Sequence, residues 1–277
     1  MIVRRFLYLI KRAIIDPRRA LRRTFARLSM PLGLRKFLGA VLPPYTGTSK
    51  MKSVYVVTYG RSGSTLLTGY LTKLPGFDLK GENYLFPLPL MEAERRMFEA
   101  RTKKYGGRDQ ATHPWYGTHQ FSLPRFRRDT LNMMLNQLYP SRPIPKTIGF
   151  KEIRWYYMIE PDKFDISLDW LRNLRAPGAV IFLFRDLDNV LTSAWWGEMT
   201  EEKRAESRIA LEAFEARSRT YAATHPESST VVTYEEFISA PEAGMRICDV
   251  LGVKFDESVW KSVLSENYSY KRDKNKK

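Results

Sequence analysis

The chain is poor in the residues that build covalent cross-links and metal sites. Its 277 residues include one cysteine and three histidines. The single thiol, Cys248, excludes an intrachain disulfide framework and favours a reducing compartment. The surrounding pattern is that of a helix face, so we expect a buried structural thiol. The histidines are few and far apart, which argues against a zinc site, and we expect no metal.

Long hydrophobic runs are also missing. Lys and Arg repeatedly interrupt the apolar residues of the first 42 positions, and no run approaches the roughly 20 apolar residues that span a bilayer. Lys11 and Arg12 break the apolar part and no clean cleavage site follows, unlike a secretory signal. We therefore expect a cytoplasmic protein, peripheral at the inner membrane face where it binds a membrane.

Acidic residues are scarce at both ends of a chain whose formal net charge is +16. Residues 1–50 carry twelve Lys and Arg against Asp16, and residues 271–277 carry five against Asp273. Residues 1–42 thus resemble a basic amphipathic helix on an anionic membrane surface, or a helix packed on the domain with its basic face solvated. Ile and Leu separate the cations, which disfavours a nucleic-acid partner.

Short apolar strands alternate with amphipathic helices from Lys52 onward. The expected strands are Val54–Thr58, Thr147–Phe150, Ala179–Phe184 and Thr230–Thr233, and the expected helices are Ser64–Lys73, Leu187–Trp196, Glu201–Thr224, Glu242–Leu251 and Ser258–Leu264. This alternation predicts an α/β fold with a central parallel sheet flanked by helices, and ligands at the carboxyl ends of its strands. Residues 87–146, rich in Arg, Pro and aromatics, are expected as an irregular insertion over that edge.

The most informative stretch leads from the strand Val54–Thr58 into the helix Ser64–Lys73. Its Gly/Ser turn gathers backbone N–H groups at the positive end of a helix dipole, an arrangement that binds phosphate or sulfate. In the nucleotide loop G-x-x-x-x-G-K-[ST], Thr58 would replace the first Gly and Ser64 the Lys, so an ATP or GTP site is disfavoured. The candidate binding residues are Arg61, Ser62, Gly63, Ser64, Thr65 and Leu66.

A second anion-binding element follows the strand Ala179–Phe184. Arg185 stands at the end of that strand, and Asp186 or Asp188 can cap the next helix. Ser193 is expected about two turns into that helix. A bidentate Arg contact and a Ser hydroxyl can meet on one phosphate group.

Together, the two elements resemble the PAPS-dependent sulfotransferase family, in its bacterial and carbohydrate-type members. The segments Gly149–Arg154 and Val232–Phe237 are also similar to that family, and the resemblance covers about residues 52–265. It implies a P-loop-type three-layer fold, with a sulfotransferase domain at 51–270. It also implies that the residues from Arg61 to Leu66 hold the 5′-phosphosulfate of PAPS (3′-phosphoadenosine-5′-phosphosulfate), and that Arg185 and Ser193 hold its 3′-phosphate.

The resemblance also implies catalytic residues. Arg61 and Lys151 are the expected cations on the sulfuryl group, which carries less charge than a phosphoryl group and needs no metal. Glu82 falls seventeen residues after Thr65, where carbohydrate-type members place a base, and partial burial would raise its pKa toward neutrality. A carboxylate base favours a carbohydrate, glycolipid or similar small acceptor. The alternative bases are His113, His119 and Glu152.

Two other functions remain open. One is a sulfate-, polyanion- or membrane-binding module, in which Arg61 and Arg185 bind sulfate groups without catalysis; binding to a heparin-like polymer with no transfer would support it. The other is a nucleotide-dependent kinase of the same fold. The missing phosphate-loop Lys counts against a kinase, and Mg-dependent ATP turnover would support it.

The charge of the N-terminal segment gives a first prediction. Each Lys or Arg near an anionic surface contributes about 1 kcal/mol, so deleting residues 1–45 should largely abolish co-sedimentation with vesicles containing anionic lipid. Neutral vesicles serve as the control. Equal partitioning of the full and shortened chains would show that this segment does not carry membrane binding.

Overall fold

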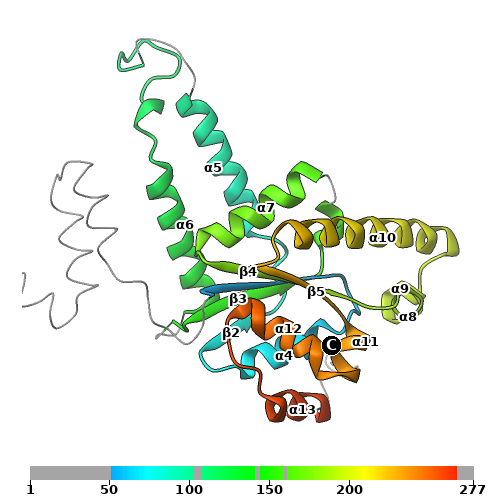
Figure 1. The fold of residues 1–277 in the computed structure, drawn as a ribbon. Coiled ribbons are helices and arrows are strands. Elements are labelled where there is room, and N and C mark those ends of the chain that lie inside the picture. Colours follow the sequence, from blue (N-terminus) through cyan, green and yellow to red (C-terminus); the bar gives the residue numbers. More distant parts are fainter. Residues whose placement is uncertain (1–50, 103–107, 141–143, 159–160, 267–277) are drawn as a thin grey trace, which may run out of the picture. The chain divides into compact units, whose positions relative to one another are not determined.

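A five-stranded parallel sheet forms the centre of the computed structural model, which describes residues 51–102, 108–140, 144–158 and 161–266 (Figure 1). The strand order is β2-β3-β1-β4-β5, and all four strand pairs are parallel. The strands are β1 (Ser53–Val57), β2 (Phe77–Lys80), β3 (Thr147–Glu152), β4 (Gly178–Phe184) and β5 (Ser229–Thr233). The N-terminal segment 1–50 and the tail 271–277 lie outside the described residues.

Strands β1 and β4 are buried along their whole length. Their near-continuous runs of apolar residues are typical of strands covered on both faces. Because side chains alternate along a strand, Tyr55 and Val57 enter one apolar cluster while Val54 and Val56 enter the other. The expected α/β fold with a central parallel sheet between helices is confirmed.

The helices cover the two faces in two groups, seen above and below the sheet in Figure 1. On the face of Tyr55 lie α5 (Pro87–Thr102), α6 (Leu123–Leu138), α7 (Pro161–Leu174) and α10 (Glu201–Thr224). On the face of Val54 lie α4 (Ser64–Lys73), α11 (Tyr234–Ser239), α12 (Pro241–Leu251) and α13 (Glu257–Ser265). Short elements complete the order: η1 (Thr118–Gln120), η2 (Trp155–Met158), α8 (Leu187–Leu191) and α9 (Ala194–Gly197).

The expected helix Leu187–Trp196 is in fact two short helices, α8 and α9. Asp186 caps the first, accepting a hydrogen bond from the Asn189 N–H, as expected. The chain then breaks because Ala194 has a φ of 48°, which a right-handed helix does not allow. Ser193 is therefore the N-cap of α9, and not a residue two turns into one helix.

The interpretation of residues 87–146 as irregular is corrected by α5 and α6, which have 16 residues each. Both helices are mostly polar, and each buries few side chains: Pro87, Leu88 and Glu94 in α5, Thr130 and Met134 in α6. Because each helix buries so few side chains, its sequence shows little of the apolar periodicity by which an amphipathic helix is recognised. The short strand β2 was likewise not among the expected strands.

Two further expectations concern buried groups and membrane spans. Cys248 is 1% exposed, within the cluster on the Val54 face, so the prediction of a buried thiol is confirmed. Among the helices of the described residues, none combines the length and the apolar character needed to cross a bilayer.

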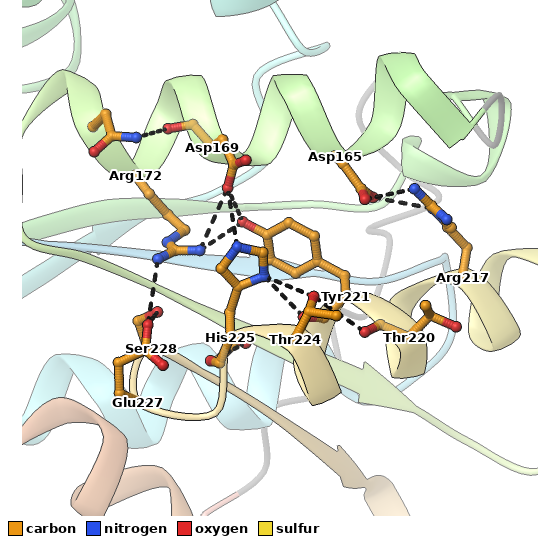
Figure 2. A network of polar contacts seen from close by, with 12 residues as sticks. Asp165, Asp169, Arg172, Arg217, Thr220, Tyr221, Thr224, His225, Glu227 and Ser228 are labelled. Atoms are coloured by element: carbon orange, nitrogen blue, oxygen red, sulfur yellow. Dashed lines mark hydrogen bonds and ion pairs between the residues drawn. The ribbon is translucent and has the colours of Figure 1, made fainter.

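A polar network joins α7 to α10 at the amino edge of the sheet, where these helices lead into β4 and β5 (Figure 2). The Tyr221 hydroxyl donates to Asp169 Oδ1 at 2.7 Å and accepts from Arg172 at 2.8 Å. The His225 ring stacks on Tyr221 with centroids 4.3 Å apart. Burial raises the pKa of the Tyr221 hydroxyl well above its usual range, so the hydroxyl stays protonated.

Replacing Tyr221 with Phe tests this network. The change removes the hydrogen bonds of the Tyr221 hydroxyl with Asp169 and Arg172, at a side chain that is 1% exposed. It should lower the free energy of unfolding by about 1–2 kcal/mol. Urea unfolding should show a lower midpoint with an unchanged slope. The same change at the exposed Tyr116 is the control, and equal midpoints for both variants would contradict a stabilising role.

Candidate active site

Five segments meet at the carboxyl edge of the sheet, one after each strand. The register pairs Val57 of β1 with Glu152 of β3, and Phe184 of β4 with Thr233 of β5. An isolated bridge also pairs Tyr59 with Arg154. Because all strands are parallel, the segments that follow them lie side by side, and this is where α/β sheets bind ligands. Each predicted site residue follows one of β1, β2, β3 and β4 or ends one of them.

The loop after β1 is held in a shape that most residues avoid. Arg61 has a φ of 69° and Gly63 one of 86°, so both are left-handed, and Gly63 forms the N-cap of α4. The buried Thr58 hydroxyl lies 2.7 Å from Ser62 Oγ and 2.6 Å from the Leu183 carbonyl. These contacts tie the loop to β4 and engage the Ser62 hydroxyl. The group that Ser62 can offer to a ligand is therefore its backbone N–H.

The predicted anion donors are the loop N–H groups. Within the described part of the chain, no hydrogen bond is formed by the N–H groups of Ser62, Gly63, Ser64 or Thr65, as expected for the first turn of a helix. The Leu66 N–H donates to the Gly63 carbonyl at 3.0 Å, and its side chain packs against the core. Leu66 therefore does not offer a donor to a ligand, and the donor series ends at Thr65.

Two aromatic rings pack against the loop glycines. A Cβ atom on Gly60 would come 2.4 Å from the Trp195 ring, and one on Gly63 would come 2.2 Å from the Tyr234 ring. Any larger residue at either position would displace a ring. Trp195 is 46% exposed whereas Trp196 is buried. The sequence places these rings about 135 to 170 residues from the loop, so their contact with it appears only in the fold.

Arg185 lies beside the loop, as predicted. Its Nη1 donates to the Arg61 carbonyl at 3.2 Å, and its guanidinium lies 4.7 Å from the centroid of the Tyr234 ring. The Tyr59 hydroxyl accepts from the Arg185 N–H at 2.9 Å. The two predicted anion elements therefore touch. Ser193 Oγ donates to the Val190 carbonyl at 2.9 Å, so the structure does not join Ser193 to Arg185 directly.

The two other predicted catalytic residues form an ion pair. Lys151 Nζ lies 2.9 Å from Glu82 Oε1, and Arg154 lies 3.4 Å from Glu82 Oε2. The Glu82 side chain is 33% exposed and that of Lys151 only 13%. Arg154 carries no predicted role, although its place just after β3 could have suggested one. The arrangement puts a carboxylate and two cations at the end of β3, next to the loop after β1.

The alternative bases lie elsewhere or are already occupied. Glu152 is fully buried and accepts hydrogen bonds from neighbouring N–H groups. His113 and His119 follow α5, whose 16 residues carry the chain about 24 Å along the helix at a rise of about 1.5 Å per residue. Figure 1 shows this segment at the end of α5 remote from the sheet. Of the four predicted bases, Glu82 is thus the one that is partly exposed at the edge.

No group of three or more His, Cys, Asp or Glu residues placed to hold a metal ion is found among the described residues.

A model of a protein family described as "Sulfotransferase family" matches residues 53–257. The chain belongs to the sulfotransferase family. The matched range holds all five strands and every residue predicted for the site. No curated protein matches this sulfotransferase.

Similar solved structures include two sulfotransferase domains. The domain from the Synechococcus PCC 7002 olefin synthase is 19% identical, with a TM-score of 0.49 and 82% of this chain and 81% of that one covered. The domain from the curacin biosynthetic pathway is 16% identical, with a TM-score of 0.46 and 78% of each chain covered. Retinol dehydratase in a complex with retinol and PAP is 16% identical, with a TM-score of 0.36 and coverage of 83% and 68%.

Proposed function

We propose that this sulfotransferase moves a sulfuryl group from PAPS to a hydroxyl or amine of a carbohydrate, glycolipid or similar small acceptor. The observation that carries the proposal is the contact between the two anion elements, in which Arg185 Nη1 donates to the Arg61 carbonyl. PAPS carries anionic groups on both its 5′ and 3′ sides, and a site for it needs two separate anion-binding elements close together. ATP has no 3′-phosphate and would leave the second element unused.

The donor would bind along the loop. The N–H groups from Ser62 to Thr65 and the N-terminus of α4 suit the 5′-phosphosulfate. Arg185 suits the 3′-phosphate, since a guanidinium binds phosphate oxygens bidentately, and Ser193 is the proposed second donor to it. The exposed Arg61 side chain supplies the cation nearest the transferred group.

The proposed reaction is an in-line transfer. The acceptor O–H gives its proton to Glu82 while its oxygen forms a bond to sulfur. The bond between sulfur and the phosphate oxygen breaks, and PAP leaves with the electron pair. Lys151 and Arg61 would stabilise the charge on the leaving phosphate and the sulfuryl oxygens, which accounts for much of the rate in such transfers. The proposal includes no metal.

The acceptor class is supported by exposed aromatic rings beside Glu82. Tyr84, two residues further on, is 78% exposed and lies over the Arg154 guanidinium at 3.9 Å. Trp195 beside the loop is 46% exposed. Apolar rings next to a few convergent polar groups are typical of small-molecule sites, and the C–H faces of sugars suit such rings.

We further propose that residues 1–42 hold the enzyme at an anionic membrane surface, at the cytoplasmic face where lipid-linked glycans are made. The support is the excess of cations over acids among apolar residues in this segment.

Calorimetric binding of PAP and ADP to the wild type and to Arg185→Ala tests the donor assignment. PAP should bind at about micromolar affinity and ADP much more weakly. The variant should lose about 1.5–3 kcal/mol of PAP binding, about 10- to 100-fold, because hydrogen bonds to charged groups are lost. Arg96→Ala, on the exposed side of α5, is the control for loss of one charge.

Other outcomes of these binding measurements would indicate a different function. Equal binding of PAP and ADP would indicate a nucleotide site of another kind, and Mg-dependent ATP turnover would identify a kinase. Absence of binding to either, with binding to a heparin-like polymer, would favour a polyanion-binding module without catalysis.

Transfer of ³⁵S from labelled PAPS to a panel of sugars, glycolipids and phenols tests the acceptor class. Sugar hydroxyls should be labelled. Tyr84→Ala should raise KM for the sugar about tenfold through lost stacking, an effect of about 1.4 kcal/mol, and leave the PAP affinity unchanged. Tyr116→Ala is the control, on an exposed ring between α5 and α6. Labelling of phenols alone would contradict a carbohydrate acceptor.

A further inference from the structure

The Glu152 carboxylate is the most heavily hydrogen-bonded side chain at the carboxyl edge. Oε2 accepts from the Asn83 N–H at 3.0 Å and the Leu85 N–H at 3.2 Å. Oε1 accepts from the Ile153 N–H at 2.9 Å, the Arg154 N–H at 3.2 Å and the Arg154 guanidinium at 2.7 Å. The side chain is fully buried, so no acceptor position is left over for a substrate proton.

These bonds keep Glu152 charged. Burial by itself would raise the pKa of the Glu152 carboxyl, but the hydrogen bonds from Asn83, Arg154, Ile153 and Leu85 outweigh it and hold the pKa below its usual range. The Glu152 carboxyl is thus ionised at neutral pH. Its role is then to hold other groups in place, and not to exchange protons.

The segment that Glu152 holds is strained. Tyr84 has a φ of 62° and Leu85 one of 56°, and two consecutive left-handed residues that are not Gly cost free energy. Such a conformation persists only where surrounding contacts fix it. The two N–H bonds to Glu152 Oε2 lie on either side of Tyr84, so they provide that fixing.

Glu82 stands immediately before this segment. Its position depends on Glu152 in two ways: through the chain at Asn83, and through Arg154, whose Nη1 lies 2.7 Å from Glu152 Oε1 and 3.4 Å from Glu82 Oε2. A base works only within hydrogen-bond reach of the proton that it takes, and a misplacement of about 1 Å can cost about 100-fold in rate.

We infer that Glu152 is a positioning residue, which clamps the turn from Glu82 to Leu85 and so holds the Glu82 carboxylate at the acceptor. This inference rests on the proposed function of Glu82 as base. The clamp joins the end of β3 to the segment after β2. A side chain from one strand thereby fixes the catalytic group that follows its neighbour.

The test compares Glu152→Gln with Glu94→Gln, which removes another buried carboxylate, one on α5 that accepts a hydrogen bond from Trp170 of α7 at 2.9 Å. The probe is ³⁵S-labelled PAPS with water as the acceptor, measured as release of inorganic sulfate. Glu152→Gln should lower this rate at least tenfold, with PAP affinity within twofold of the wild type. Glu94→Gln should change neither the rate of sulfate release nor the PAP affinity. This should hold even if Glu94→Gln and Glu152→Gln unfold at the same urea concentration.

A second readout measures the clamp itself. Hydrogen exchange at the Asn83 and Leu85 amides should be slow in the wild type and in Glu94→Gln, and fast in Glu152→Gln. Should Glu152→Gln fail to fold, Glu152→Asp, which withdraws the carboxylate by one methylene, should show the same split between rate and PAP affinity.

Two results would overturn the inference: fast exchange at both amides in the wild type, or wild-type sulfate release by a folded Glu152→Gln. Failure of the proposed function looks different. In that case the wild type binds no PAP and releases no sulfate, while the two amides stay protected.

Discussion

The pairing of β1 with β3 on one side and with β4 on the other is the constraint on which the rest depends. It places the loop after β1 between Glu152 at the end of β3 and Arg185 just after β4. Thr58 strengthens the arrangement, with its N–H bonded to the Glu152 carbonyl and its hydroxyl to the Leu183 carbonyl. Small changes in strand register would therefore separate the groups that we propose to meet on one donor molecule.

Three cations at the edge are paired with nearby acids or an aromatic ring. Lys151 and Arg154 are paired with Glu82, and Arg154 is also paired with the buried Glu152. Arg185 is stacked on Tyr234 and lies 3.9 Å from Glu235. These three cations are thus oriented by neighbours before any ligand arrives, which reduces the side-chain entropy lost on binding.

Three of the four left-handed non-glycine residues in the described part of the chain lie in the two segments that carry the proposed chemistry. The left-handed Arg61 precedes α4, and the left-handed Tyr84 and Leu85 follow Glu82. Each segment is fixed by buried polar groups from another strand, Thr58 with the Leu183 carbonyl in the first case and Glu152 in the second. Such strain is common at functional sites, where a surrounding rigid scaffold maintains it.

The sequence by itself determined the parallel α/β fold, the strand-loop-helix corner at Arg61 to Thr65, and the places of Arg185 and Lys151 at strand ends. These follow from local periodicity and turn chemistry, which neighbouring residues express directly. Only the tertiary structure decided the break before Ala194, the polar helices α5 and α6, and the partners of the site residues. The contacts of Glu152 with Asn83 and Leu85 span 67 to 69 residues, and no local pattern encodes which distant amides a buried carboxylate will meet.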